Sequence, residues 1–407
     1  MHATIFSRLT LLMLLFWLTA CNSQTRPARP DKDKQPAVGG SFENREFTYY
    51  GIPKNFSARD TSPGWKEEGQ KILLTGTIYQ ADGKTPAPGV LLYYYHTNTA
   101  GRYEHKPEEQ RSMPPNEQGQ THGYIRGWVK TDSAGKYFIY TTRPGTYPTR
   151  DAPAHVHATI KEPNTINEYY IDDFVFDDDE LVNTAYRKKM ENRCGSGVVK
   201  LVQQDNLWIG ERNIILGLHI PGYPATAETG LNSGLSVGED VFSFIPYHAW
   251  GPDKGTRTCP VCKYGWYHGI LYCAGKNPDW PAIKQWLGFL EKESRKREKY
   301  LKVYFVYGNE EGYSKKGREK ELEKIGAELK LEKVALTFVP SFTDSESEVD
   351  LNKINPAAAN TFILYKRGKV IDKFINLEPG PENFDRISRR LNETINEYFY
   401  LHGAEGE

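Results

Sequence analysis

The stretch from Arg143 to Ala158 reads RPGTYPTRDAPAHVHA and brings a tyrosine and two histidines close together. The proline and glycine at the start of this stretch predict a rigid turn that presents Tyr147. Side chains of a strand alternate between its two faces, so we expect His155 and His157 to point the same way. Ala154 and Val156 would face the opposite way. The stretch therefore predicts a turn followed by a β-strand that presents two imidazoles on one face.

Residues 41–222 read as an all-β domain, because apolar strand patterns alternate with turn residues. The turn at 98–101 (NTAG) is followed closely by Tyr103. The turn at 132–135 (DSAG) lies between two strand patterns and predicts a β-hairpin. The strands are predicted at residues 72–79, 90–95, 128–131 and 137–142.

Tyr103 and Tyr147, together with His155 and His157, form a donor set that suits ferric iron. Phenolate oxygens neutralise much of the charge of a hard, oxidised cation, and imidazoles add borderline nitrogen donors. A tyrosine with a pKa of ~10 rarely ionises at neutral pH unless a cation holds the anion. Each residue alone has an ordinary alternative, either a packed tyrosine or a histidine on a solvated strand face. The metal site is therefore predicted from all four residues together.

These residues and their neighbours resemble the intradiol ring-cleavage dioxygenases, most closely the protocatechuate and catechol dioxygenase core. The resemblance covers about residues 72–180, and each of the four metal ligands of that family has a counterpart here in the same order. It implies a β-sandwich that holds one Fe(III) per chain through the two tyrosines and the two histidines. The motifs that carry the resemblance are NTAGRY at 98–103, TD at 131–132, GKY at 135–137, RPGTYP at 143–148 and PAHVH at 153–157.

The chemistry implied by the resemblance is the opening of a catecholic ring by O2 between its two hydroxylated carbons, which gives a muconate-type diacid. Ferric iron acts in that family as Lewis acid and template. By the same resemblance, Tyr147 is the ligand that the substrate displaces, and it then serves as a base. The family has an arginine where this chain has Ala152, and Arg150 is the nearby arginine predicted to take its catalytic role. Asp172 and Asp173 stand in the stretch where the family often has a glutamine near the metal.

Two other groups of residues offer metal ligands. The run DDDE at 177–180 reads as a solvated acidic loop, with a calcium site as the alternative, because carboxylate oxygens suit that ion. The motif CPVC places Cys259 and Cys262 at the spacing of a disulfide. Thiol–disulfide exchange is one alternative, and zinc held by these two cysteines with His268 and Cys273 is another. A redox-active pair would follow a strand and open a helix, whereas CPVC precedes a predicted strand and opens no obvious helix.

Residues 240–402 read as an α/β domain that resembles the thioredoxin-like proteins, and residues 223–239 read as the linker to it. The resemblance rests on the order of the predicted elements and on the ending NTFILY at 360–365. Residues 279–295 carry apolar side chains at helical spacing. Strands are predicted at 269–273, 301–307, 334–339, 361–365 and 370–375, and helices at 279–295, at 315–329 and near the end.

The first residues predict a lipoprotein. Residues 1–20 contain an arginine followed by an apolar run at 9–18 that is too short to span a membrane, as in a signal peptide. The residues LTAC at 18–21 match a lipobox, so Cys21 would be lipidated and residues 21–40 would form a flexible tether. The alternative is an ordinary secretory signal with a stray cysteine. We expect a cell-envelope protein, lipid-anchored to a bacterial membrane on its periplasmic or extracellular side.

The composition restricts the class of partner. The chain has 52 basic and 52 acidic residues, and this balance argues against nucleic acid as an obligate partner. Three functions fit the patterns. The first is an iron-dependent dioxygenase that acts on a catecholic substrate with O2, as in aromatic compound catabolism. The second is a non-catalytic binding module for a catecholic or surface ligand. The third is a thiol–disulfide protein that uses Cys259 and Cys262.

Overall fold

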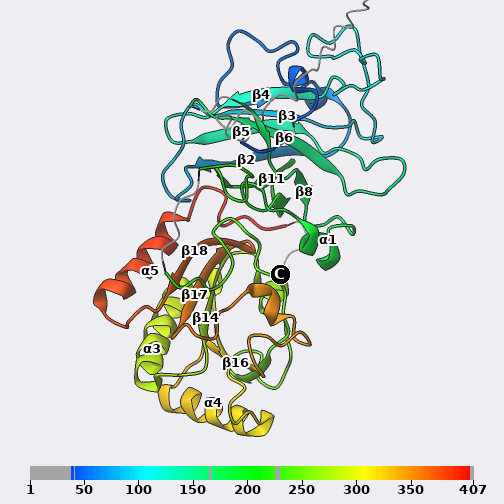
Figure 1. Cartoon of the computed structure of the whole chain (residues 1–407). Helices are drawn as coiled ribbons and strands as arrows, with labels where there is room; N and C mark the ends of the chain where they lie inside the picture. The colour runs from blue at the N-terminus through cyan, green and yellow to red at the C-terminus, as the bar shows by residue number, and fades with distance from the viewer. Residues whose placement is uncertain (1–37, 41, 165–166, 225–229, 404–407) are drawn as a thin grey trace, which may run out of the picture. The chain divides into compact units, whose positions relative to one another are not determined.

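The computed structural model describes residues 38–40, 42–164, 167–224 and 230–403 (Figure 1). All the described residues belong to one compact unit. The predicted signal peptide and Cys21 lie outside the described residues. Within the described ranges, no helix has both the length and the apolar character needed to cross a membrane.

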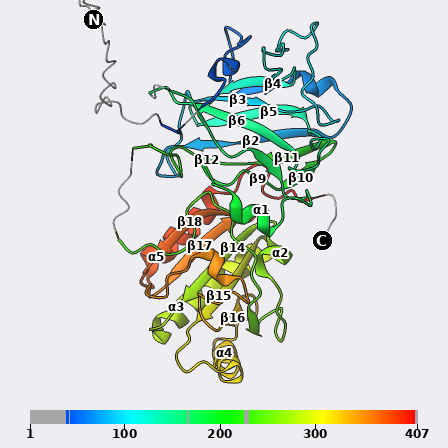
Figure 2. The same ribbon diagram turned by 45° about the vertical axis from the view of Figure 1, so that its right-hand side comes forward.

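Two sheets build the part of the chain that carries the predicted metal ligands (Figures 1 and 2). The first sheet consists, in spatial order, of β1 (Arg59–Thr61), β5 (Lys136–Thr142), β2 (Lys71–Tyr79), β11 (Leu207–Glu211) and β10 (Leu201–Gln204), with β12 (Ile214–Ile215) paired to β2. The second consists of β4 (Arg126–Lys130), β3 (Leu91–Tyr95), β6 (His155–Lys161), β8 (Phe174–Phe176) and β9 (Val198–Val199), with β7 (Tyr169–Tyr170) paired to β6. A short helix, α1 (Thr184–Lys189), lies between β8 and β9 in sequence.

The two sheets share one apolar core. On β6, Val156 and Ala158 are buried and belong to the same cluster as Ile72 of β2. Because side chains alternate along a strand, His155 and His157 lie on the opposite face of β6, where they are half-buried. The sequence pattern AHVHA is thus reproduced, and this part of the chain is mostly β as predicted.

The hairpin predicted around the DSAG turn is wrong. β4 and β5 are consecutive in sequence but lie in different sheets, so the turn carries the chain from one sheet to the other. Asp132 organises the turn by accepting hydrogen bonds from the backbone N–H groups of Ala134 and Lys136. Gly135 supplies a φ of +70°, which a residue with a side chain rarely adopts. The turn chemistry and the strand after the turn were predicted correctly, but the pairing of the two strands was not.

The third sheet lies in the C-terminal part of the chain, with helices packed on it (Figure 2). Its spatial order is β13 (Tyr247–Trp250), β16 (Ala335–Val339), β15 (Leu301–Gly308), β14 (His268–Ala274), β17 (Thr361–Lys366) and β18 (Lys369–Ile375). β14 runs parallel to β15 and antiparallel to β17. The α-helices here are α2 (Pro260–Tyr264), α3 (Trp280–Arg297), α4 (Lys315–Leu329) and α5 (Pro381–Glu393), and 3-10 helices occur at Arg45–Thr48, Pro63–Lys66, Glu298–Tyr300 and Val349–Asn352.

The helix α3 illustrates how local sequence sets these elements. Asp279 caps the helix, because its carboxylate accepts a hydrogen bond from the backbone N–H of Ala282 at 3.1 Å. Trp286, Leu287 and Leu290 are fully buried at helical spacing and belong to the core cluster of the third sheet. Burying side chains of this size contributes about 2 kcal/mol each.

Candidate metal centre

The strand β6 is held against an aromatic neighbour at the level of the site. His157 is in register with Tyr95 of β3, and the two rings stack with centroids 4.5 Å apart. The ring of His122 also stacks on Tyr95, at 3.5 Å. At the start of β6, the backbone N–H of Ala154 donates to Asp179 at 2.9 Å. These contacts fix the strand that presents both imidazoles.

The two tyrosines reach the site from neighbouring loops that are bound to each other. The backbone N–H of Gly145 donates to the carbonyl of Asn98 at 3.0 Å. Gly101 has a φ of +73°, and a Cβ at this position would lie only 1.8 Å from the carbonyl oxygen of Thr146. Only glycine permits this close approach. The loops that carry the two tyrosines therefore meet because one of them lacks a side chain at the contact.

The structure brings the polar atoms of all four predicted ligands together. The hydroxyl oxygens of Tyr103 and Tyr147 lie 2.9 Å apart. The Tyr147 oxygen lies 3.1 Å from Nε2 of His155 and 3.4 Å from Nε2 of His157. The two Nε2 atoms are 3.1 Å apart. Donors that each lie about 2 Å from one cation are about 3 Å from one another, so these spacings fit a shared metal ion.

The second nitrogen of each imidazole shows which nitrogen is free to bind a metal. Nδ1 of His155 lies 2.7 Å from the carbonyl oxygen of Pro153, and Nδ1 of His157 lies 3.0 Å from a carboxylate oxygen of Asp173. A carbonyl oxygen and an ionised carboxylate can only accept hydrogen bonds, so both Nδ1 atoms donate. In neutral rings both Nε2 atoms would carry lone pairs, and these two atoms lie 3.1 Å apart. A cation bound by both lone pairs fits this spacing, so the donor set fits a metal ion.

The protonation states of the ligands depend on such a cation. Burial raises the pKa of Tyr103 and of Tyr147, so both phenols stay protonated at neutral pH when no cation is present. Burial, aided by the neighbouring His157, lowers the pKa of His155, which keeps its ring neutral and ready to bind a metal. A bound cation would instead stabilise the ionised phenolate form of both tyrosines.

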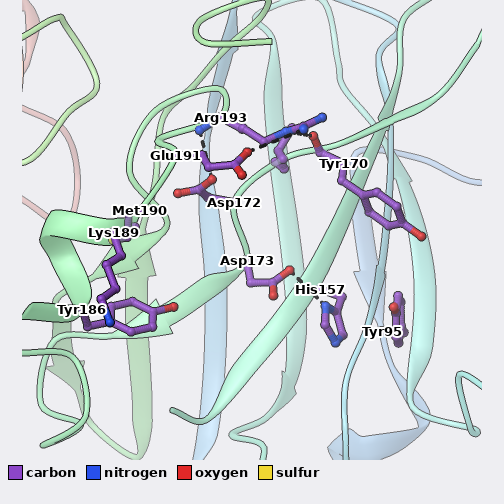
Figure 3. Close-up of a pocket in the computed structure, with 11 residues that line it drawn as sticks. Tyr95, His157, Tyr170, Asp172, Asp173, Tyr186, Lys189, Met190, Glu191 and Arg193 are labelled. Atoms are coloured by element: carbon purple, nitrogen blue, oxygen red, sulfur yellow. Dashed lines mark hydrogen bonds and ion pairs between the residues drawn. The ribbon is translucent and has the colours of Figure 1, made fainter. Parts of the chain in front are cut away.

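A cavity of about 580 Å³ lies beside His157 (Figure 3). This volume can accept a small aromatic ligand. In Figure 3, Asp173 lies between His157 and Tyr186, and Tyr186 and Lys189 of α1 form the far wall. The complete lining is Tyr95, His157, Tyr170, Ile171, Asp172, Asp173, Tyr186, Lys189, Met190, Glu191 and Arg193.

Arg150 lies three residues after Tyr147, in the segment that leads to β6. Its side chain is exposed and makes no hydrogen bond or ion pair with any described residue. Its backbone N–H donates to the carbonyl of Tyr147 at 2.8 Å, and its φ of +52° directs the chain out of the turn. The catalytic role assigned to Arg150 from the sequence stays a prediction.

Asp172 and Asp173 have separate roles that sequence reasoning missed. The carboxylate of Asp172 accepts backbone hydrogen bonds from Asn192 and Arg193, both at 3.0 Å, and so closes the loop beside the cavity. Asp173 instead accepts from His157. Among the described residues, the group of His, Cys, Asp and Glu that surrounds a common point is His155, His157 and Asp173. The carboxylate at a family glutamine position was the one signal in the sequence that could have found this contact.

Within the described residues, the acidic run at 177–180 does not bring three carboxylates together as a calcium site would. Its carboxylates bind cations and backbone N–H groups of the chain itself. Arg187 and Lys200 pair with Asp177, Arg143 pairs with Asp178, and the backbone N–H groups of Ala154 and Leu181 donate to Asp179. Arg143 precedes the turn that carries Tyr147, so the run supports the predicted ligands from outside the site.

Cys259 and Cys262 form a disulfide. Contrary to expectation, the motif opens a helix, because Cys259 caps the five-residue α2 by accepting from the N–H of Cys262. The zinc shell predicted as an alternative is absent from the described structure, since the disulfide removes two of its four ligands. Cys273 is a buried free thiol, and His268 lies 3.0 Å from the hydroxyl of Thr394.

Residues 47–194 match the model of a family described as Dioxygenase. The chain is 32% identical over 98 residues to the beta chain of protocatechuate 3,4-dioxygenase from Burkholderia cepacia, over 23% of this chain and 39% of that protein. It is 29% identical over 123 residues to catechol 1,2-dioxygenase from Acinetobacter baylyi, over 26% of this chain and 37% of that protein. The chain thus spans less than half the length of these relatives. The matches support an intradiol dioxygenase core in this part of the chain.

Solved structures give a weaker similarity. The dioxygenase domain of a carbohydrate-binding fusion protein from Streptomyces sp. SirexAA-E is 17% identical, with a TM-score of 0.30, over 45% of this chain and 98% of that chain. An intradiol ring-cleavage dioxygenase from Tetranychus urticae is 18% identical, also with a TM-score of 0.30, over 47% of this chain and 96% of that chain. Scores this low carry no argument about the chain.

Proposed function

From the match of residues 47–194 to the dioxygenase family, we propose that the chain is a non-haem iron dioxygenase that opens a catecholic ring with O2 to a muconate-type diacid. Tyr103, Tyr147, His155 and His157 would hold one Fe(III). When bound, the ferric ion supplies a Lewis acid and a template that make the aromatic ring reactive toward O2.

The observation that supports this proposal most directly is the close approach of the two Nε2 atoms to each other and to one phenol oxygen. His155 and His157 both point Nδ1 at an acceptor, their Nε2 atoms lie 3.1 Å apart, and the Tyr147 oxygen lies 3.1 and 3.4 Å from them. Two phenols with two neutral imidazoles match the donor preference of a hard, oxidised cation.

The two tyrosines have different surroundings, which suggests different roles. Tyr103 packs against the aromatic cluster that contains Tyr95, with ring centroids 5.9 Å apart. Tyr147 begins a turn, closed by the hydrogen bond from the N–H of Arg150 to its carbonyl, and is followed by three exposed residues. The phenol on the turn can leave the ligand position without disturbing the core. Tyr147 is therefore the ligand proposed to make way for the catechol and to accept one of its protons.

The visible absorption spectrum of the iron-loaded protein tests the proposal. Tyrosinate bound to Fe(III) absorbs visible light by charge transfer, so we expect a coloured protein. The colour should weaken in Tyr103→Phe and Tyr147→Phe and persist in Tyr400→Phe, whose side chain is 53% exposed. Addition of catechol should shift the band, and oxygen consumption should follow. A colourless protein that binds no stoichiometric iron would refute the proposal.

A second candidate function is a binding module that holds a catecholic or surface ligand without turnover. It is favoured by one observation, the absence of a cation from the position of the family arginine. That position is Ala152, and the neighbouring Arg150 is exposed and unpaired among the described residues. A catechol-dependent shift of the visible band without oxygen consumption would support the binding module over the enzyme.

We also propose that residues 240–402 form a thioredoxin-like domain. The support is the placement of β14 between a parallel β15 and an antiparallel β17, with α3 directly after β14. The segment between β14 and α3 holds no cysteine. A thiol–disulfide function, the third candidate, would therefore depend on Cys259 and the exposed Cys262, which lie before β14. Loss of activity in Cys262→Ser but not in Tyr147→Phe would favour it.

The proposed location is the cell envelope, with a lipid on Cys21 and the mature chain on the non-cytoplasmic side of a bacterial membrane. The support is the sequence LTAC at 18–21 after a short apolar run. Metabolic labelling with a clickable fatty acid tests it. We expect incorporation into the parent protein and none into Cys21→Ser, and labelling of both proteins alike would exclude Cys21 as the anchor.

A further inference from the structure

One wall of the cavity beside His157 is a short helix that needs contacts with the rest of the chain to stay folded. Tyr186 and Lys189 of α1 line the cavity, across from His157 and Asp173 in Figure 3. α1 has six residues, and none of them is buried. A helix this short is not stable by itself in water. The shape of the cavity therefore depends on what holds α1.

The local contacts of α1 are few. Asn183 caps the helix by accepting from the backbone N–H of Tyr186 at 3.1 Å. Tyr186 and Met190 pack at the edge of a small apolar cluster made by Val175, Val182 and Val198. This cluster is separate from the main core of the two sheets. Apolar packing alone thus gives α1 only a small anchor.

Arg187 supplies a longer-range anchor. One of its terminal nitrogens lies 2.5 Å from a carboxylate oxygen of Asp177, just after β8. The other lies 3.0 Å from a carboxylate oxygen of Asp240. Asp240 is 53 residues away in sequence and lies shortly before the third sheet begins. The guanidinium fork therefore ties α1 to two separate segments.

The carboxylate of Asp240 accepts hydrogen bonds from the β-rich part of the chain and from the C-terminal α/β part. Besides Arg187, it accepts from the hydroxyl of Ser196 at 2.7 Å and from Nζ of Lys369 at 3.0 Å. Lys369 begins β18, and the backbones of Asp240 and Lys369 also form a β-bridge. The side chain of Asp240 is only 14% exposed, so water and salt screen these charges weakly.

We propose that Asp240 is a positioning residue for the cavity, and that the C-terminal α/β part of the chain holds the α1 wall in place through it. The part of a ligand affected is the substituent that extends beyond the catechol ring toward Tyr186 and Lys189. That assignment of the ligand rests on the proposed function. The mechanical link between Asp240 and α1 does not, because it follows from contacts that need neither iron nor catechol.

Hydrogen exchange of the iron-free full chain tests the link. Asp240→Asn keeps the shape of the side chain but removes its charge, and we expect the amides of residues 184–190 to exchange about tenfold faster. Asp372→Asn is the matched control. Asp372 is also buried, lies on β18 and pairs with Lys84 across to the first part of the chain, but it does not touch α1. We expect α1 to exchange in this control as in the parent.

Two further variants separate a specific effect from general loosening. Asp240→Glu keeps the charge and should restore much of the protection of α1. Arg187→Lys keeps a charge but cannot reach both carboxylates, so it should resemble Asp240→Asn. Unchanged exchange of α1 in Asp240→Asn would overturn the proposal. Equal acceleration in Asp240→Asn and Asp372→Asn would overturn it as well, because the effect would then be general.

Ligand binding provides a second readout. We expect Asp240→Asn to keep the visible band of the iron-loaded protein, and to bind 4-tert-butylcatechol about tenfold more weakly while binding unsubstituted catechol nearly as the parent does. An equal loss of affinity for both catechols would show that the α1 wall does not contact the substituent. If the parent protein binds neither catechol, the proposed function fails, and the exchange experiment alone decides the role of Asp240.

Discussion

Nδ1 of His157 lies 3.0 Å from Oδ1 of Asp173, so a predicted metal ligand donates a hydrogen bond through Nδ1 to a carboxylate. Burial raises the pKa of this carboxyl, but the neighbouring His157 outweighs burial, and the pKa of Asp173 is lowered overall. The carboxylate is therefore charged at neutral pH. A charged acceptor fixes the orientation of the imidazole and increases the basicity of its free nitrogen.

Replacing this carboxylate should weaken the metal site. In Asp173→Asn we expect the affinity for Fe(III) to fall roughly ten- to a hundredfold, because the amide holds the imidazole less firmly and no longer favours charge on the ring. Competition with a chelator measures the change. Asp205→Asn, at an exposed turn, is the control and should bind iron as the parent does. An unchanged affinity in Asp173→Asn would mean that the contact does not tune the metal.

Gly101 makes a second prediction, since it lies where the loops of the two tyrosines touch. Gly101→Ala should abolish the visible band of the iron-loaded protein, because a Cβ 1.8 Å from the carbonyl of Thr146 must push the loops apart. Gly119→Ala is a matched control with a similar φ of +75° and open space around it. It should lower the free energy of unfolding by about 1 kcal/mol and leave the band intact. A band that persists in Gly101→Ala would show that the loops can adjust.

The sequence predicts well what depends on local pattern. The helix α4 begins and ends at the predicted residues, and the alternation around His155 places both imidazoles on one face. The failed hairpin depends on something else. A turn such as DSAG defines how the chain reverses locally, but the sheet that receives the next strand is set by packing between distant segments.

The contact between His157 and Asp173 also depends on packing between distant segments. It requires β8 to pair beside β6, with Val175 opposite His155, and no local pattern specifies that pairing. The meeting of Tyr103 and Tyr147 also could not be derived from periodicity, and it was expected from the donor set and from the resemblance to a family.

The buried His96 predicts a dependence of stability on pH. Burial lowers its pKa to about 4, with the carbonyl of Thr97 opposing and His155 and His157 assisting the shift. The unfolded chain takes up this proton below about pH 6.5, whereas the folded chain stays neutral until about pH 4. Stability is therefore lost as pH falls through this window, by an amount on the order of 3 kcal/mol.

Urea unfolding of the iron-free protein between pH 7 and pH 4 measures this loss. His96→Gln should show a shallower fall in the free energy of unfolding than the parent. The slope will not vanish, because His122, whose pKa burial lowers to about 3, acts in the same direction. His402→Gln, at an exposed position, should follow the parent curve. Parallel curves for His96→Gln and the parent would show that His96 is not the source of the dependence.

Removing the disulfide between Cys259 and Cys262 tests whether the function depends on the iron site or on these two cysteines. The two cysteines are three residues apart, and closing so short a loop restricts the unfolded chain only a little. We expect the double variant Cys259→Ser/Cys262→Ser to lose at most about 2 kcal/mol of unfolding free energy. Its visible band and its response to catechol should match those of the iron-loaded parent. If the variant keeps its iron and its fold but loses oxygen consumption, the disulfide takes part in function, and the iron site alone does not explain the activity.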